Sequence, residues 1–226
     1  MGQISVHYMK KIAIYGAGGF GREVACLINV INHSKIDSEW DLIGFFDDNP
    51  ELKGKKISHF GLCLGGMEEL NAFPDELAVT IPIGNPSVVK ELVGKIQNDK
   101  IYYPNLIRPD FLIGDESTFV IGKGNIIQGG CSVSCDVTFG DFNVLNGSVC
   151  FGHDAKVGSF NTFMPGTRIS GGVTIGDNNF FGVGSIVLQM LKIGKNIRLG
   201  AGSVLMTKPK DGTLYIGNPA AIFRFE

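Results

Sequence analysis

The chain has 226 residues, of which 44% are hydrophobic and 19% are charged, and its formal net charge is −2. It is long and apolar enough to bury a core, which excludes a disordered chain and a coiled coil. Lysine and arginine form no run along the sequence, so no nucleic-acid partner is expected. Because no apolar segment reaches about 18 residues and the first ten residues carry no signal or myristoylation motif, we expect a soluble cytoplasmic protein without a membrane partner.

The five cysteines contain no C-x-x-C pair, which argues against a disulfide framework or a zinc site. We expect them to be small buried side chains: Cys26, Cys63, Cys131, Cys135 and Cys150. Glycine is the unusual residue, since 32 of 226 residues is twice the ordinary share of about 7%. Many positions must therefore need tight turns.

The first element after residue 10 is a predicted strand over 11–15, followed by Gly16-Ala17-Gly18-Gly19-Phe20-Gly21 and a helix to about Asn32. This is a G-x-G-x-x-G motif between a strand and a helix, where glycines let the backbone approach a phosphate. Nucleotide binding is the favoured interpretation. NAD chemistry is an alternative with little room for a hydride-accepting domain, and a purely structural turn is another.

Further strands are predicted over 42–46, 77–83 and 101–103. The first ends in Asp47-Asp48, roughly where an acidic residue meets a ribose hydroxyl in dinucleotide-binding folds. The second leads through Gly84-Asn85-Pro86 into a helix that begins at Pro86. Together these elements predict a Rossmann-like βαβ domain.

The second half has a six-residue period with a large apolar residue at every step. Glycine often stands directly after the anchor, and a small or medium residue stands four positions after most anchors. No helix has this period, and the pattern predicts a parallel β-helix in which residues 18 apart stack at about 4.8 Å. The anchors are Ile121, Ile127, Val133, Phe139, Leu145, Phe151, Val157, Phe163, Ile169, Ile175, Phe181, Val187, Ile193, Leu199 and Leu205.

His153 is the single histidine of this repeat. It lies two residues after the anchor Phe151, so we expect it to point outward beside Asp154, with Gly171 one coil later at the same phase. A neutral imidazole there can take a proton from an amine or hydroxyl, and the next coil's N–H can hold an oxyanion. The alternative is an ordinary exposed histidine. One histidine excludes the three-histidine zinc site of β-helical carbonic anhydrases, and no metal is expected.

Nearly the whole chain resembles one family through the segments KKIAIYGAGGFGREV, GFFDDNP, IPIGNP, NGSVCFGHDAKVGSF, SGGVTIGDNNFFGVGS and GNPAA. It is similar to bacterial sugar acyltransferases of the sialic acid O-acetyltransferase (NeuD) type, which include UDP-amino-sugar N-acetyltransferases of the PglD and PerB kind. The resemblance implies a left-handed β-helix of hexapeptide repeats, acetyl-CoA as co-substrate and a homotrimer. It divides the chain into an extension (1–10), a Rossmann-like nucleotide-sugar-binding domain (11–108), the β-helix (109–209) and a C-terminal tail (210–226).

The resemblance also implies roles for individual residues. It makes His153 the general base, Asp154 its acidic neighbour and Gly171 the oxyanion-holding amide. The residues implied in substrate binding are Gly18, Gly19, Phe20, Asp47, Asp48, Gly84 and Asn146, and those implied in acetyl-CoA binding are Thr162, Val183 and Ala201. Two positions depart from the family, since Thr162 and Arg108 stand where some relatives have histidine.

The leading hypothesis is an acetyl-CoA-dependent acetyltransferase that acts on the amine of a UDP-linked amino sugar, in glycan biosynthesis. O-acetylation of sialic acid or another sugar hydroxyl is the alternative within the same class. A non-catalytic, trimeric nucleotide-binding scaffold is the alternative from another class. We expect direct transfer without an acetyl-cysteine, because we expect no cysteine at the phase of His153 in the repeat. Cys150 is only three residues away but lies on an earlier face of the coil.

Overall fold

The computed structural model describes residues 9–34 and 39–224. The chain divides into two compact units, each described here by itself. The first comprises the described residues up to Pro82 together with Lys95–Pro104, and the second comprises Ile83–Gly94 together with the residues from Asn105 onward. Most of the predicted extension over 1–10 lies outside the described residues. Within the described ranges, no helix has the length and apolarity that a membrane span requires.

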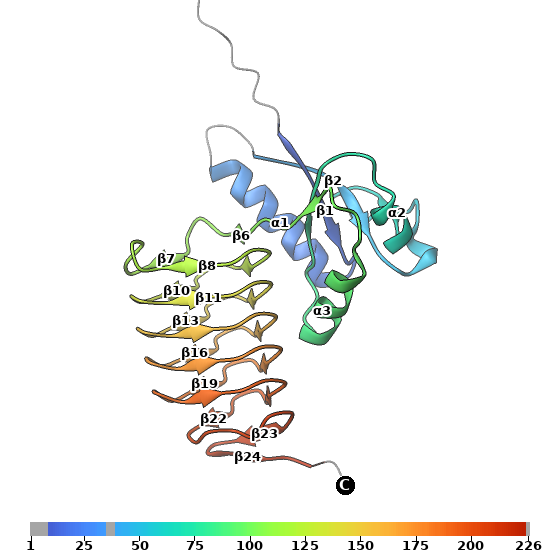
Figure 1. The fold of residues 1–226 in the computed structure, drawn as a ribbon. Helices are drawn as coiled ribbons and strands as arrows, with labels where there is room; N and C mark the ends of the chain where they lie inside the picture. The colour runs from blue at the N-terminus through green and yellow to red at the C-terminus, as the bar shows by residue number, and fades with distance from the viewer. Residues whose placement is uncertain (1–8, 35–38, 225–226) are drawn as a thin grey trace, which may run out of the picture. The chain divides into compact units, whose positions relative to one another are not determined.

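The first unit is built on a parallel sheet with the strand order β3-β2-β1-β4-β5 (Figure 1). Its strands are β1 (Lys10–Tyr15), β2 (Trp40–Phe46), β3 (Cys63–Gly65), β4 (Leu77–Thr80) and β5 (Ile101–Tyr102). Its helices are α1 (Gly19–Ser34), the 3₁₀ turn η1 (Pro50–Leu52) and the short α2 (Met67–Asn71). The predicted Rossmann-like domain is confirmed, although β3 was not predicted and β4 ends three residues before its predicted end.

Burial explains why the central strand forms. Ile12, Ala13, Ile14 and Tyr15 are all at most 2% exposed, as expected of a strand covered on both faces of a parallel sheet. The connections reverse direction between β1 and β4, and ligands of such sheets bind at the carboxyl ends of the strands beside this point.

The second unit begins with helix α3 (Pro86–Lys95), which starts at the predicted proline and buries Val89 and Leu92. Asn178 Nδ2 of the β-helix donates a hydrogen bond to Ser87 Oγ at 3.0 Å. Residues 83–94 therefore belong to the same compact unit as the β-helix.

The rest of the second unit is the predicted left-handed β-helix, whose short parallel strands stack coil on coil (Figure 1). Face 1 contains β6 (Leu106–Ile107), β9 (Ile126–Ile127), β12 (Val144–Leu145), β15 (Thr162–Phe163), β18 (Phe180–Phe181), β21 (Arg198–Leu199), β23 (Leu214–Gly217) and the closing antiparallel β24 (Ala220–Ile222). Face 2 contains β7 (Leu112–Ile113), β10 (Ser132–Val133), β13 (Cys150–Phe151), β16 (Arg168–Ile169), β19 (Ile186–Val187) and β22 (Val204–Leu205). Face 3 contains β8 (Val120–Ile121), β11 (Thr138–Phe139), β14 (Lys156–Val157), β17 (Thr174–Ile175) and β20 (Lys192–Ile193).

The register confirms the predicted 18-residue coil. Cys150 pairs with Ser132 on one side and with Arg168 on the other. The anchors from Ile127 to Leu205 are at most 5% exposed, and Ile121 is partly buried against them. The first coil is longer, since Leu112 pairs with Ser132 twenty residues later.

A column of buried asparagines fills one inner corner of the β-helix. Asn125, Asn143, Asn161 and Asn179 are at most 1% exposed. The backbone N and the Nδ2 of each of the last three donate to the Oδ1 of the asparagine one coil earlier, at 2.8–3.0 Å. The column satisfies polar groups that burial would otherwise leave unpaired.

Glycines at the corners of the β-helix, such as Gly124 and Gly166, do form turns with a positive φ, whereas the glycines directly after the anchors serve a different purpose from the one expected. In the corners from Gly124 to Gly202 the left-handed backbone lies three residues after the anchor, where Asp154 has φ 58° and Asn178 has φ 61°. The glycines that directly follow the anchors instead allow close stacking. A Cβ on Gly158 would lie 2.9 Å from the carbonyl carbon of Gly176, and one on Gly182 would lie 2.6 Å from Ala201 N.

Candidate active site

The glycine-rich loop after β1 presents open backbone at the start of helix α1. Gly16 has a φ of 119°, which favours glycine, and a Cβ on Gly21 would lie 1.9 Å from the Gly16 carbonyl oxygen. In contrast, nothing comes within 4 Å of a Cβ on Gly18 or Gly19, which are both exposed. The half-buried Phe20 follows in the first helical turn. Backbone amides at such a helix start are a natural site for a phosphate.

Two acidic residues follow β2 at the same edge of the sheet. Asp47 Oδ2 accepts a hydrogen bond from Ala17 N of the glycine-rich loop at 2.9 Å. Asp48 Oδ1 accepts from the Tyr15 hydroxyl and from Met67 N. Burial, and then the Asp48 carboxylate, raise the pKa of Tyr15, so the phenol stays protonated and donates. Asp47 is thus bonded to the glycine-rich loop, whereas Asp48 is bonded to the end of β1 and the start of α2.

A pocket of about 500 Å³ lies beside this pair. Lys53 Nζ donates to Glu69 Oε1 at 2.5 Å, and this bond lowers the pKa of Glu69 to about 2. Carboxylates accept hydrogen bonds, so the pocket suits the hydroxyl or N–H donors of a nucleoside. It is lined by Asp47, Asp48, Pro50, Lys53, Gly65, Gly66, Met67, Glu68 and Glu69. Gly84, also predicted to bind substrate, belongs to the second unit, where nothing lies within 4 Å of its Cβ position.

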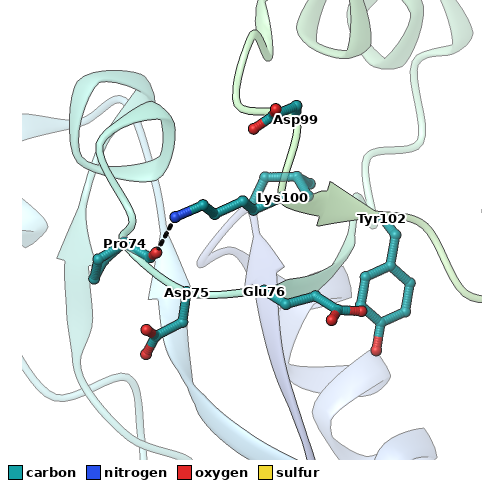
Figure 2. Close-up of a pocket in the computed structure, with 7 residues that line it drawn as sticks. Pro74, Asp75, Glu76, Asp99, Lys100 and Tyr102 are labelled. Atoms are coloured by element: carbon teal, nitrogen blue, oxygen red, sulfur yellow. Dashed lines mark hydrogen bonds between the residues drawn. The ribbon is translucent and has the colours of Figure 1, made fainter.

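Another pocket of the first unit, of about 470 Å³, contains none of the predicted residues (Figure 2). It lies at the amino ends of β4 and β5, away from the edge where ligands of parallel sheets bind. Two of its charged groups have partners within the protein. Lys100 Nζ donates to the Pro74 carbonyl at 2.6 Å, as Figure 2 shows, and Asp75 pairs with Lys11 at 2.9 Å. We assign it no role.

His153 lies on a corner of the β-helix that we call the His153 corner, formed by the turns between faces 2 and 3 (134–137, 152–155, 170–173, 188–191 and 206–209). Its Nδ1 is 2.7 Å from Asp154 Oδ2, and the two side chains are 56% and 60% exposed. Because a carboxylate only accepts, a neutral ring in this pair carries its hydrogen on Nδ1. Nε2 then presents a lone pair, and it has no hydrogen-bond partner within the described residues.

Gly171 lies directly against the His153 ring. A Cβ at this position would be 2.5 Å from Nε2 and 2.7 Å from Cε1, so any other residue would displace the ring. The Gly171 N–H meets no acceptor among the described residues. The corresponding amide of Gln189, one coil later, is also unpaired. Gly171 therefore differs by combining a free N–H with an imidazole beside it.

A cysteine also lies at the phase of His153, contrary to the expectation that none does. Cys135 precedes His153 by one 18-residue coil, and Asp154 N donates to the Cys135 carbonyl at 3.0 Å. Its thiol is partly exposed and contacts Ser134 Oγ at 4.0 Å. The 18-residue period of the repeat was the signal that could have identified Cys135, since this residue lies 18 positions before His153. Cys63 and Cys131 are buried as predicted, whereas Cys26 is exposed and Cys150 is partly exposed.

The remaining predicted residues lie elsewhere on the β-helix. Val183 is 49% exposed and Ala201 follows it one coil later, on the corner between faces 1 and 2, which we call the Asn146 corner (146–149, 164–167, 182–185 and 200–203). Asn146 and His153 stand at opposite ends of β13. Thr162 is only 1% exposed on face 1, so it offers no open surface to a ligand.

Arg108, the other position that departs from the family, lies across Gly129. A Cβ on Gly129 would fall 2.3 Å from an Arg108 terminal nitrogen. Arg108 Nε is also 3.4 Å from Asp110 Oδ1. Within the described ranges, no three histidine, cysteine, aspartate or glutamate side chains gather as metal ligands.

Comparison with known proteins agrees with this arrangement. Residues 11–96 match the model of the PglD N-terminal domain family. The UDP-N-acetylbacillosamine N-acetyltransferase of Bacillus subtilis (strain 168) is 30% identical over 120 residues, which cover 53% of this chain and 52% of that protein. The chain thus aligns with about half the length of that relative.

Two solved structures extend the likeness to the whole fold. The acetyltransferase domain of PglB from Neisseria gonorrhoeae FA1090, in complex with acetyl coenzyme A, is 25% identical with a TM-score of 0.84, covering 96% of this chain and 100% of that one. WeeI from Acinetobacter baumannii AYE is 27% identical with a TM-score of 0.82 and the same coverage. These matches confirm the resemblance of this chain to the family of PglD-type sugar acetyltransferases.

Proposed function

We propose that the protein transfers the acetyl group of acetyl-CoA to the amine of a nucleotide-linked amino sugar, with a UDP-sugar as the preferred acceptor. The observation that carries the proposal is the His153 imidazole, which is hydrogen-bonded to Asp154, lies on Gly171 and has a free Nε2. The acetyltransferase names of the relatives and the acid-lined pocket beside the glycine-rich loop support it.

In the proposed reaction, the amine nitrogen attacks the thioester carbonyl carbon while His153 Nε2 takes the amine proton. The carbonyl oxygen becomes negative and accepts a hydrogen bond from Gly171 N–H. The C–S bond then breaks, and the CoA thiolate leaves and takes up a proton. The Asp154 carboxylate holds the ring and stabilises the imidazolium. A positioned base contributes roughly 10²–10⁴-fold to such a step.

The proposal includes a homo-oligomer, a trimer in line with the resemblance. Face 2 separates the His153 corner from the Asn146 corner, where Val183 and Ala201 are exposed. In a homo-oligomer, the His153 corner of one copy can face the Asn146 corner of a neighbouring copy, and a ligand between the two copies then contacts both corners. Both sets of predicted residues then contribute to one site.

The experiment offers purified protein acetyl-CoA with a UDP-4-amino-sugar, a UDP-3-amino-sugar or sialic acid, and reads products by mass spectrometry. Acetylation of a UDP-amino-sugar is the expected result. We expect His153→Ala to lose this acetylation. His59→Ala, which removes an exposed histidine of the first unit, is the control and should keep it. Acetylation of sialic acid alone refutes N-acetylation, and nucleotide binding without any product from the panel supports the scaffold alternative.

A further inference from the structure

The pocket beside the glycine-rich loop is lined by four carboxylates, and two of them are bonded through both of their oxygens. Asp47 accepts backbone N–H groups from Asn49 at 3.0 Å and from Ala17 at 2.9 Å, one on each oxygen. Glu69 accepts from Lys53 Nζ at 2.5 Å and from a backbone N–H at 2.7 Å, again one on each oxygen. These two carboxylates therefore hold the segments around the pocket together.

Asp48 differs because its two oxygens are used unequally. Oδ1 accepts from the Tyr15 hydroxyl and from Met67 N at 3.3 Å, so both of its lone pairs are taken. Oδ2 has no hydrogen-bond partner among the described residues, and the side chain is exposed at the pocket. Glu68, the fourth carboxylate, is exposed as well, but no hydrogen bond within the described ranges orients its side chain. Asp48 Oδ2 is therefore an acceptor that the protein holds in place and leaves open.

Tyr15 sets the orientation of the Asp48 carboxylate. It is the last residue of β1 and is only 2% exposed, so packing fixes the direction of its hydroxyl. Burial, and then the hydrogen bond to Asp48, raise the pKa of Tyr15, so the hydroxyl keeps its proton and donates it to the carboxylate. Met67 N, at the first residue of α2, donates to the same oxygen. Two donors from different elements thus bind Oδ1 and leave Oδ2 to a ligand.

A single open acceptor oxygen distinguishes between nucleobases. The Watson–Crick edge of uracil carries one N–H, at N3, between two carbonyls. Guanine carries two adjacent donors, N1–H and its amino group, which match both oxygens of a carboxylate, and cytosine carries an acceptor at N3. Lys53 Nζ lines the same pocket and uses one of its three hydrogens on Glu69, so it has donors left for a uracil carbonyl.

Resting on the proposed function, we propose that Asp48 Oδ2 accepts the N3–H of uracil, and that Tyr15 is the positioning residue that makes this pocket select uracil over guanine. Tyr15 acts through Asp48 and does not touch the ligand. Guanine would place its second donor against Oδ1, which has no lone pair left for it. Cytosine would place an acceptor against an acceptor. A site built on such a hydrogen bond discriminates strongly, because a mismatched base leaves polar groups unpaired.

The test measures the Kd values of UDP, CDP and GDP by calorimetry for the full chain, in the wild type, Tyr15→Phe and Asp48→Asn. Two controls should bind UDP as the wild type does. Tyr215→Phe removes a phenol of the second unit, whose hydroxyl accepts from Lys210 N at 3.0 Å, and Asp99→Asn removes an exposed carboxylate of the first unit. We expect the wild type to bind UDP at least about tenfold more tightly than CDP or GDP.

Tyr15→Phe frees the Asp48 carboxylate to turn both oxygens toward a ligand. We expect the Kd of UDP to rise about tenfold while that of GDP stays within about threefold. The KM for a UDP-amino-sugar should rise with the Kd of UDP, while kcat at saturation stays unchanged. A general structural defect would instead weaken both nucleotides equally.

Asp48→Asn gives a second and independent readout. Its amide oxygen must face the Tyr15 hydroxyl and Met67 N, because both are donors, so the amide N–H groups face the ligand. We expect UDP to bind about 10- to 100-fold more weakly. CDP, whose N3 accepts a hydrogen bond, should now bind more tightly than UDP.

An unchanged preference for UDP over GDP in folded Tyr15→Phe overturns the positioning role. Should Tyr15→Phe fail to fold, the reversal between UDP and CDP in Asp48→Asn decides alone. Equal losses for all three nucleotides in Asp48→Asn overturn base recognition and assign Asp48 to the ribose, which the three share. Failure of the proposed function has a different signature, because the wild type then binds none of the three nucleotides and acetylates no UDP-amino-sugar.

Discussion

Replacing Gly171 with alanine tests the geometry around His153 without removing any proposed reactive group. The new Cβ would lie 2.5 Å from His153 Nε2, 2.7 Å from Cε1 and 2.8 Å from Cδ2. Ordinary contact begins near 3.5 Å, so the ring must retreat by about 1 Å. A displacement of about 1 Å costs roughly 100-fold in rate when the moved group takes part in the reaction.

The same substitution should leave the fold intact. Gly171 does not adopt a left-handed φ, and the His153 side chain is 56% exposed and free to move toward solvent. We expect the free energy of unfolding to change by less than about 1 kcal/mol.

The assay for Gly171→Ala compares steady-state acetyl transfer with thermal unfolding. Gly94→Ala is the matched control, because nothing lies within 4 Å of its Cβ position in helix α3. The expected result is a fall in kcat of about 100-fold for Gly171→Ala alone, with Tm values within a few degrees. A Gly171→Ala protein that keeps kcat within threefold refutes the close coupling of this glycine to a catalytic imidazole.

Three further predictions follow from the described contacts. Asp154→Asn keeps a residue type that tolerates the observed φ of 58° but removes the carboxylate, so kcat should fall about 10- to 100-fold with little change in Tm; an unchanged kcat contradicts a role for the charge. Cys135→Ser should retain activity within about threefold if transfer is direct, whereas loss of turnover together with an acetylated wild-type protein in mass spectra indicates a thioester intermediate on this cysteine. Asn143→Ala removes the acceptor of two buried donors of Asn161 and should cost about 2–5 kcal/mol in urea unfolding, while Thr174→Ala on exposed face 3 should cost under about 1 kcal/mol.

The β-helix could be predicted from the sequence because a large apolar residue recurs every six positions. Each anchor from Ile127 to Leu205 fills the interior of one coil, so its six-residue period follows directly from the geometry of three faces. The order strand, glycine-rich turn, helix likewise identified β1 and α1. Strand β3 was missed because Cys63–Gly65 is too short for any alternation to be seen.

The candidate site was only partly readable. The phase of His153 and Gly171 could be counted, and the structure brings the two into contact. Counting in the other direction would have found Cys135, which was overlooked. The role of the glycines after the anchors could not be read, because it depends on how closely the next coil approaches.

The central claim is that His153 acts as the base in acetyl transfer and does not hold the acetyl donor. The most direct measurement is therefore turnover of a UDP-amino-sugar together with the Kd of acetyl-CoA in wild type and His153→Ala. We predict a fall in turnover of about 10²–10⁴-fold with a Kd that stays within threefold. A His153→Ala protein that keeps most of its turnover contradicts the account.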